Sequence, residues 1–305
     1  EVCVKGNKLF VNGMHVKLRG ACRHDIHPTQ GRSTTPEQDK LDVLLAKEAN
    51  INFIRTSHYP PSKEFLEYCD EYGLYVEEET AICFVGTYRN EPYQSKGASQ
   101  NDSAYTARYL SQLSEMIDRD RNHPSVIIWS IGNENEYGSN FRAEYEFVKR
   151  TDRSRPVMFS YPGKVPKDST CFDIVSIHYV SFDGSANQLG IEIKDFGLPT
   201  IPALHDEWAH VACYDTSTLK ADPNERNFWG ESLKRMWDKC FESDGGLGGA
   251  IWGYIDEYFM LPDTVVGYGP WGILDLWRRK KPEFWLTKKA YSPVRVEQTS
   301  FPSYD

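Results

Sequence analysis

Two glutamates in this sequence stand directly behind short apolar runs, each with polar residues beside it. Glu134 follows Gly132-Asn133, and Glu207 follows His205-Asp206. Cleavage of a glycosidic bond needs two carboxyl groups that face one anomeric carbon, one protonated to assist the leaving oxygen and one ionised to attack. If the ionised group attacks the sugar directly, the two carboxyl groups lie roughly 5–5.5 Å apart. Arg55 is our candidate for the cation that keeps the attacking carboxylate ionised, because a nearby positive charge favours the charged form.

Further polar side chains follow other apolar runs along the chain. In a barrel of parallel strands the active site lies at the carboxyl ends of the strands, so residues that directly follow strands meet at one rim. This clustering favours a functional site over a random surface. The residues behind the apolar runs include Arg23, His24, Asp25 and His27; Arg55, Ser57, His58 and Tyr59; Glu77, Glu78 and Glu79; Asn133, Glu134, Asn135 and Glu136; His178 and Tyr179; His205, Asp206, Glu207 and Trp208; and Trp252, Asp256 and Glu257.

Eight apolar runs alternate with helical patterns. Runs rich in Val, Ile or aromatic residues and bounded by polar residues, Gly or Pro are typical of buried strands. Thr35-Pro36 is a typical helix start and Gly73 a typical helix end, and longer helices are predicted over Ser103–Arg121 and Glu225–Ser243. The alternation predicts an α/β fold, a (β/α)8 TIM barrel. The predicted strands are Val16–Cys22, Ile51–Thr56, Leu74–Glu79, Val126–Ile131, Val157–Ser160, Ile174–Tyr179, Ile201–Asp206 and Gly249–Ile255.

Both ends of the chain fall outside this alternation. Val2–Val4 and Lys8–Val11, followed by the turn Asn12-Gly13, predict a short N-terminal β-hairpin over residues 1–15 that closes the bottom of the barrel. The catalytic barrel is then expected over residues 16–291. Residues 292–305 are interpreted as a C-terminal linker or the start of a further domain.

Composition excludes several classes of partner. The 305 residues carry a formal net charge of −9 with no long Lys/Arg block, which argues against nucleic acid. No apolar run approaches the roughly 18 residues that span a bilayer, so no membrane partner is expected. The seven cysteines are odd in number and show no C-x-x-C spacing, which gives no sign of a disulfide framework or a zinc site. Localisation stays open between the cytoplasm and the periplasm.

Four stretches carry a family resemblance. They are Arg23-His24-Asp25-Ile26-His27-Pro28, Arg55-Thr56-Ser57-His58-Tyr59-Pro60, Asp120-Arg121-Asn122-His123-Pro124-Ser125-Val126 and Trp129-Ser130-Ile131-Gly132-Asn133-Glu134. With them the chain resembles the catalytic TIM barrel of glycoside hydrolase family 2, the family of bacterial β-galactosidases and β-glucuronidases. The resemblance covers nearly all of residues 6–295.

The resemblance implies a retaining, exo-acting β-glycosidase that works by double displacement. Glu134 falls at the acid/base position of the family and Glu207 at the nucleophile position. Asn133 is then expected to hydrogen-bond the sugar 2-hydroxyl. We add Trp208 as a candidate flat platform for the sugar. The other positions that match the family's sugar-binding subsite are His24, Arg55, His58, Tyr179 and Trp252.

Two departures from the family pattern bear on metal and substrate. The family's best-known β-galactosidase carries magnesium ligands shortly after the third strand, where this chain has Cys83 and Val85. We therefore predict no metal and no cofactor. The Asn-x-Lys pair of glucuronidases is not found around residues 271–281, although Glu79-Thr80-Ala81 looks glucuronidase-like. We expect a carbohydrate substrate, β-galactoside first, with β-glucuronide and β-mannoside as alternatives. β-Sandwich domains of a longer parent chain are expected as partners.

Two other function classes compete with this reading. Barrel hydrolases that use a metal-bound water place His and Asp at strand ends, and His24, His27, His58, His178 and Asp256 imitate such a set. No His-x-His follows the first strand, which counts against this class. A non-catalytic carbohydrate-binding barrel would be favoured by the loss of either glutamate, and both are present. Asp206 is expected to point away from Glu207, because side chains alternate along a strand.

Overall fold

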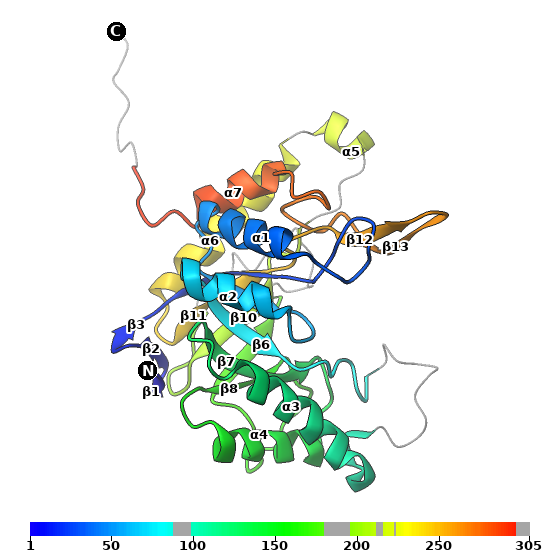
Figure 1. Ribbon diagram of the computed structural model, residues 1–305. Coiled ribbons are helices and arrows are strands. Elements are labelled where there is room, and N and C mark those ends of the chain that lie inside the picture. The colour runs from blue at the N-terminus through cyan, green and yellow to red at the C-terminus, as the bar shows by residue number, and fades with distance from the viewer. Residues whose placement is uncertain (88–98, 180–195, 212–215, 223, 297–305) are drawn as a thin grey trace.

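Eight parallel strands close into a barrel at the centre of the molecule. The computed structural model describes residues 1–87, 99–179, 196–211, 216–222 and 224–296. Around the ring each strand pairs in parallel with its neighbours, and β11 closes onto β4, which confirms the predicted TIM barrel (Figure 1). The strands are β4 (Leu18–Cys22), β5 (Phe53–Thr56), β6 (Tyr75–Glu79), β7 (Val126–Asn133), β8 (Val157–Ser160), β9 (Ile174–His178), β10 (Ala203–Trp208) and β11 (Gly246–Ile251).

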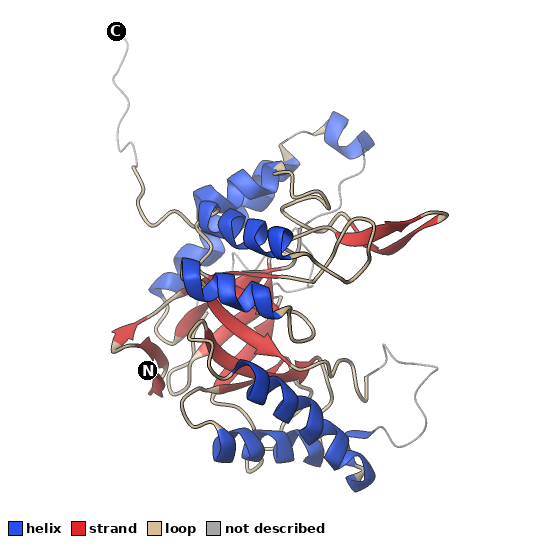
Figure 2. Ribbon diagram, viewed as in Figure 1, coloured by secondary structure: helices blue, strands red, loops and turns tan. Residues whose placement is uncertain are grey.

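Helices follow most of the strands and cover the outside of the barrel (Figure 2). Local signals explain where several of them begin and end. The Thr35 side chain accepts a hydrogen bond from the backbone N–H of Gln38, and Gly73 ends the second helix at φ 73°. The helices of the described residues are α1 (Pro36–Glu48), α2 (Lys63–Tyr72), α3 (Thr106–Asp120), α4 (Ser139–Thr151), α5 (Thr216–Ala221), α6 (Glu225–Glu242) and α7 (Pro282–Ala290), with short 3-10 turns η2 (Ser99–Asn101) and η3 (Ser103–Tyr105). None of them is long and apolar enough to cross a membrane.

Sequence patterns misplaced or missed some of these elements. The helix predicted from Ser103 begins at Thr106, because a 3-10 turn occupies the first three residues. Helix α4 was not predicted, and its N-cap Gly138 forms no side-chain cap hydrogen bond that would have marked its start. The antiparallel hairpin of β12 (Glu257–Leu261) and β13 (Thr264–Gly269) was also missed.

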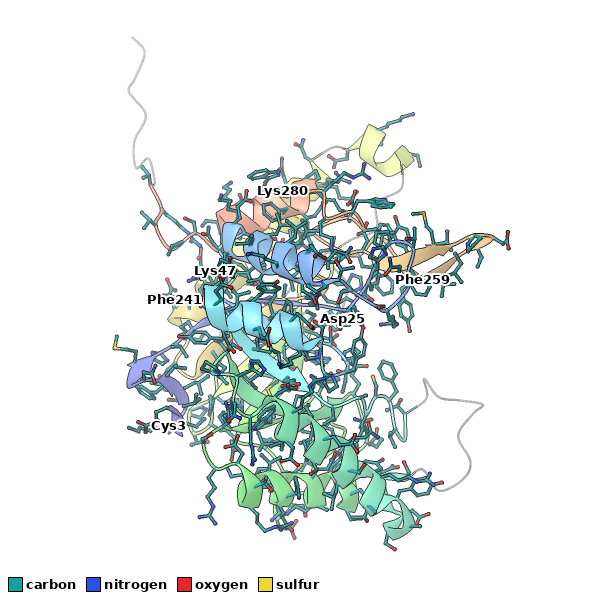
Figure 3. All side chains as sticks on the ribbon, viewed as in Figure 1. Cys3, Asp25, Lys47, Phe241, Phe259 and Lys280 are labelled. Atoms are coloured by element: carbon teal, nitrogen blue, oxygen red, sulfur yellow. The ribbon has the colours of Figure 1, made fainter. Side chains whose placement is uncertain are left out.

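The N-terminal strands and the β12–β13 hairpin lie on opposite sides of the barrel (Figure 1). Strands β1 (Val2–Lys5) and β2 (Lys8–Val11) pair as the predicted antiparallel hairpin, and β3 (Met14–His15) adds a short third strand. Leu9 of β2 is fully buried and joins the apolar cluster inside the barrel. In Figure 3, Cys3 of β1 lies on the side away from Asp25 and Phe259, which mark the mouth.

Most large apolar side chains pack in two layers. One cluster lies between the strands and the helices and contains Trp129, Trp208 and Trp229. The other fills the inside of the barrel with residues such as Phe53 and Met158. The barrel is therefore a packed core rather than a pore, and the site must be built at its end.

Gly248 of β11 provides a test of this closure. Its φ is 141°, and a Cβ at this position would overlap the carbonyl of Leu18 on the neighbouring strand. We expect Gly248→Ala to lower the free energy of unfolding by about 3 kcal/mol or more, since rigid backbone cannot relax around the methyl group. Urea unfolding followed by circular dichroism measures it.

The matched control is Gly6→Ala, at φ 60° with no other atom within 4 Å. Only the backbone conformation is penalised there, so a loss of about 1 kcal/mol is expected. Equal losses in the two variants would contradict the close approach of β11 and β4.

Candidate active site

Glu134 and Glu207 meet at the mouth of the barrel. Glu134 directly follows β7, and Glu207 lies in β10. One carboxylate oxygen of each, together with a ring nitrogen of His178, forms a group whose members all lie within 4.8 Å of one another. This separation suits two carboxyl groups that act on the same carbon atom, since direct attack by one of them requires roughly 5–5.5 Å.

Arg55 of β5 is the cation beside Glu207. Its guanidinium is fully buried, and Nη1 donates to Glu207 Oε1 at 2.8 Å. Nη2 donates to Glu79 Oε2 at 2.8 Å and to Asn133 Oδ1 at 2.7 Å. Burial alone would lower the pKa of Arg55, but Glu79, Asp206 and Glu207 raise it well above its ordinary value. Arg55 therefore places a permanent positive charge against one oxygen of Glu207.

The second oxygen of Glu207 is held by Tyr179. The Tyr179 hydroxyl donates to Glu207 Oε2 at 2.8 Å. Burial and the charge of Glu207 raise the pKa of Tyr179 well above its usual value, so this phenol stays a neutral donor. With one donor on each oxygen, the Glu207 carboxylate is fixed in position and has lone pairs left to face a substrate.

His178 at the end of β9 connects the two glutamates. Its Nδ1 lies 3.0 Å from Glu134 Oε1 and 3.7 Å from Glu207 Oε2. Burial lowers the pKa of His178, but Glu207 and Asp206 outweigh it and raise the value to about 10. The ring is therefore an imidazolium at neutral pH. The sequence alone predicted His178 only as a strand-end residue and as one of the histidines that could suggest a metal site. Its role as a cation depends on Glu134, Asp206 and Glu207, which come from other strands.

Asp206 points into the barrel, and the prediction that it points away from Glu207 was wrong. Irregular register on both sides of β10 breaks the simple alternation of side chains between Leu204 and Trp208. Asp206 Oδ2 accepts a hydrogen bond from Ser160 Oγ at 2.6 Å and lies 3.5 Å from His178 Nε2. Burial would raise the pKa of Asp206, yet His178 and Arg55 hold it well below its ordinary value.

Asn133 and His58 are held by the same network. Asn133 Oδ1 accepts from Arg55, and its Nδ2 lies 3.3 Å from Cys83 Sγ. His58 Nδ1 lies 2.8 Å from Glu79 Oε1, and its Nε2 lies 3.9 Å from Glu207 Oε1. Burial would raise the pKa of Glu79, but Arg55 and His58 lower it. Glu79 thus orients both Arg55 and His58.

Trp252 and His24 form an aromatic wall beside Glu207. The Trp252 ring stacks on His58 with centroids 5.2 Å apart and meets the edge of His24 at 5.6 Å. His24 also contacts His58 at 5.6 Å. Burial, His58 and Arg32 together lower the pKa of His24 well below its ordinary value, so it is a neutral ring. The structure therefore brings together all but one of the predicted sugar-binding residues.

Trp208 is the exception, and its assignment to sugar binding was wrong. Its side chain is fully buried in the layer between the barrel and the helices. It stacks on His205, and its indole N–H donates to Tyr291 Oη at 3.3 Å. Trp208 therefore stabilises the packing of β10 and cannot touch a ligand at the mouth.

Cys83 and Val85, which occupy the positions that match the family's magnesium ligands, do not fit that ion. Burial raises the pKa of the Cys83 thiol to about 12, which keeps it protonated, and Val85 has no donor atom in its side chain. Glu134, His178 and Glu207 are close enough together to coordinate a cation. That set coincides with the paired carboxylates, so a metal there would compete with the proton on His178.

Comparisons with known proteins agree with the fold. A family model described as glycosyl hydrolases family 2, TIM barrel domain, matches residues 2–267. Curated relatives include β-galactosidases of Alteromonas mediterranea, 37% identical over 264 residues, and of Photobacterium profundum, 33% identical over 260 residues. Each covers 84% of this chain, while the chain spans only 23% of the relative.

Solved structures give a second comparison. The β-D-glucuronidase of Dictyoglomus thermophilum superposes with a TM-score of 0.78 at 25% identity, covering 96% of this chain and 54% of that chain. A β-galacturonidase of Eisenbergiella tayi gives 0.74 at 27% identity, with coverages of 99% and 55%.

The charge on His178 predicts a pH dependence of stability. The proton binds more tightly in the folded state, with a pKa of about 10, than at the ordinary value of 6.5. Its stabilising contribution is complete below about pH 6.5 and is lost as the pH rises through about 10. We expect His178→Gln to lower the free energy of unfolding at pH 7, with the difference from the parent closing by about 1 kcal/mol per pH unit above that.

Urea titrations from pH 6 to pH 10.5 measure this difference. Thiols and phenols titrate in both proteins and largely cancel in the comparison. A constant difference across the range would contradict an imidazolium between the two glutamates.

Proposed function

Because the chain belongs to glycosyl hydrolase family 2, whose TIM barrel domain model matches residues 2–267, we propose that it is a retaining exo-β-glycosidase. The observation that carries this proposal is the pair Glu134 and Glu207, whose carboxylate oxygens lie within 4.8 Å at the mouth of the barrel. An inverting enzyme needs room for a water between one carboxylate and the sugar, with its two carboxyl groups roughly 6.5–9.5 Å apart. The shorter separation of Glu134 and Glu207 supports direct attack instead.

The first step forms a glycosyl-enzyme. Glu207 attacks the anomeric carbon, and the bond from that carbon to the leaving oxygen breaks while Glu134 donates a proton to it. Arg55 and Tyr179 orient Glu207 for the attack through bonds of 2.8 Å each. His178, 3.0 Å from Glu134 Oε1, stabilises the carboxylate that Glu134 becomes.

The second step releases the sugar. Glu134 takes a proton from water, the resulting hydroxide oxygen bonds to the anomeric carbon, and the ester bond to Glu207 breaks. Two inversions give net retention of configuration. In the proposed mechanism Asn133 binds the 2-hydroxyl, and the 2.7 Å hydrogen bond that its Oδ1 accepts from Arg55 supports this role by fixing the amide.

A terminal β-galactoside is the substrate that we propose. The curated relatives at 33% and 37% identity are β-galactosidases, which supports this sugar. The structural neighbours named as a glucuronidase and a galacturonidase make a β-uronide the alternative. Since the chain spans 23% of the curated relatives, we also propose that the barrel acts beside further domains of a longer chain.

Replacing the carboxyl groups tests the mechanism. We expect Glu207→Gln and Glu134→Gln each to lower kcat on an aryl β-galactoside by about 10³-fold or more, because each step needs both groups. The matched control is Glu136→Gln, an exposed glutamate two residues from Glu134, whose activity should stay within about twofold of the parent.

Proton NMR of the first-formed sugar adds a stereochemical readout. Retention predicts that the β-anomer appears first and then mutarotates. Initial release of the α-anomer, or turnover in Glu207→Gln equal to the parent, would exclude the proposed double displacement.

Chelation separates this mechanism from a metal-dependent hydrolase. We expect full activity on the aryl β-galactoside after exhaustive dialysis against EDTA, because the proposed steps use protons and carboxylates only. Loss of activity that a divalent cation restores would instead support metal binding by Glu134, His178 and Glu207.

A further inference from the structure

Glu257 is a buried carboxyl group at the mouth that the proposed mechanism does not use. It begins β12, directly behind the loop that follows β11, and is 5% exposed. Its Oε2 forms no hydrogen bond with any described residue. The His24 ring nitrogen Nε2 lies 3.8 Å from Oε2, and that ring is neutral. The carboxyl group therefore has hydrogen-bonding capacity left over.

A chain of contacts connects Glu257 to the reacting centre. His24 packs its ring edge-on against both His58 and Trp252, with centroids 5.6 Å apart in each case. His58 Nε2 in turn lies 3.9 Å from Glu207 Oε1. Glu257 therefore extends the wall of His58, Trp252 and His24 that begins at Glu207.

The chemistry of Glu257 suits a hydroxyl group. Burial and the charge of Glu207 raise the pKa of Glu257 to about 8, so that at neutral pH it carries a proton. A protonated carboxyl offers one donor and one acceptor, and a sugar hydroxyl offers the same two functions. Leaving such a buried polar group unpaired is costly, so a ligand that pairs it gains affinity.

The surrounding charges disfavour a substrate carboxylate. Arg55 and His178 already face Glu79, Glu207, Glu134 and Asp206. Lys281 donates to Asp256 Oδ1 at 2.8 Å. Arg32, which is exposed, donates to Tyr59 Oη at 3.0 Å and is 3.0 Å from His24 Nδ1. Arg55, His178 and Lys281 are thus already paired with carboxylates, so none of these three described cations is free to neutralise a substrate carboxylate beside Glu257.

We propose that Glu257 is a specificity-determining residue that hydrogen-bonds the C6 hydroxyl of the terminal sugar and selects a neutral β-galactoside over the β-galacturonide, which carries a carboxylate in place of that hydroxyl. This inference rests on the proposed function. It differs from that function in naming which of two substrates, alike except at carbon six, the site accepts.

Matched aryl β-galactoside and aryl β-galacturonide test the assignment in the parent, Glu257→Ala and Glu257→Gln. We expect the parent to prefer the galactoside, and Glu257→Ala to lower kcat/KM for the galactoside by about 10- to 100-fold. The loss on the galacturonide should be smaller, so that the ratio of the two kcat/KM values falls by about tenfold. Glu257→Gln keeps a donor and an acceptor and is neutral like the protonated acid, so it should retain most galactoside activity and a ratio close to that of the parent.

The control is Asp263→Asn, an exposed acidic residue in the turn of the same hairpin, which should leave the ratio unchanged. Thermal unfolding of each variant shows whether it is folded. The inference is overturned if the parent prefers the galacturonide, or if Glu257→Ala leaves the ratio of kcat/KM values where it was. That last result would mean that Glu257 only supports the hairpin.

Binding of free galactose and galacturonate, followed by NMR titration, needs no turnover and separates the two proposals. If neither aryl glycoside is cleaved but the binding preference shifts in Glu257→Ala, the proposed activity fails and the role of Glu257 in recognition stands. If the galactoside is cleaved and neither binding nor kcat/KM shows a shift in preference, the role of Glu257 fails and the glycosidase proposal stands.

Discussion

The buried guanidinium of Arg55 is the interaction on which the mouth of the barrel depends. It is fully buried and donates to Glu79, Asn133 and Glu207, which come from three other strands. A buried charge is tolerated only when it is paired and hydrogen-bonded, so the positions of these groups are determined together. Glu207 acquires its orientation as part of this set and not from β10 alone.

A balance of charge completes this arrangement. Asp206 and Glu207 from β10 add negative charge within a small buried volume, and His178 supplies a second cation among them. Burial and Asp206 raise the pKa of Glu77 well above its usual value. Glu77 therefore takes up a proton instead of adding another negative charge. The site thus holds two cations, Arg55 and His178, among carboxyl groups whose pKa values move in opposite directions: those of Glu79 and Asp206 are lowered and that of Glu77 is raised.

The bottom of the barrel serves mainly its stability, and the mouth carries the candidate active site. At the bottom, Leu9 of β2 is buried in the same interior apolar cluster as Leu18 and Ile174, while Asn7 and Lys17 donate to backbone carbonyls nearby. At the mouth, the polar side chains come from strand ends and from the segments that follow them. Close packing below permits a buried polar network above, because the strands that carry it cannot shift to relieve unpaired groups.

Local patterns in the sequence were sufficient for the strand order and for the two glutamates. Apolar runs of the right length alternate with capped helices, and parallel strands bring their carboxyl ends to one rim, so Glu134, Glu207, Arg55 and His58 could be placed without coordinates. The family recognised from the motifs is confirmed by the match over residues 2–267.

Other features of the site could be found only from the tertiary structure, because they depend on strand register and on charges that lie far apart in the sequence. The irregular pairing of β10 turns Asp206 inward beside Glu207, against the alternation that a regular strand would impose, whereas Trp208 packs outside the barrel. Carboxylates at positions 206 and 207 stabilise the proton on His178. Glu257, whose Oε2 has no hydrogen-bond partner among the described residues, begins a hairpin that was not predicted from the sequence, although Pro262-Asp263 lies in its turn. A sequence pattern reports neighbours along the chain, whereas these properties arise between residues that only the closed barrel brings into contact.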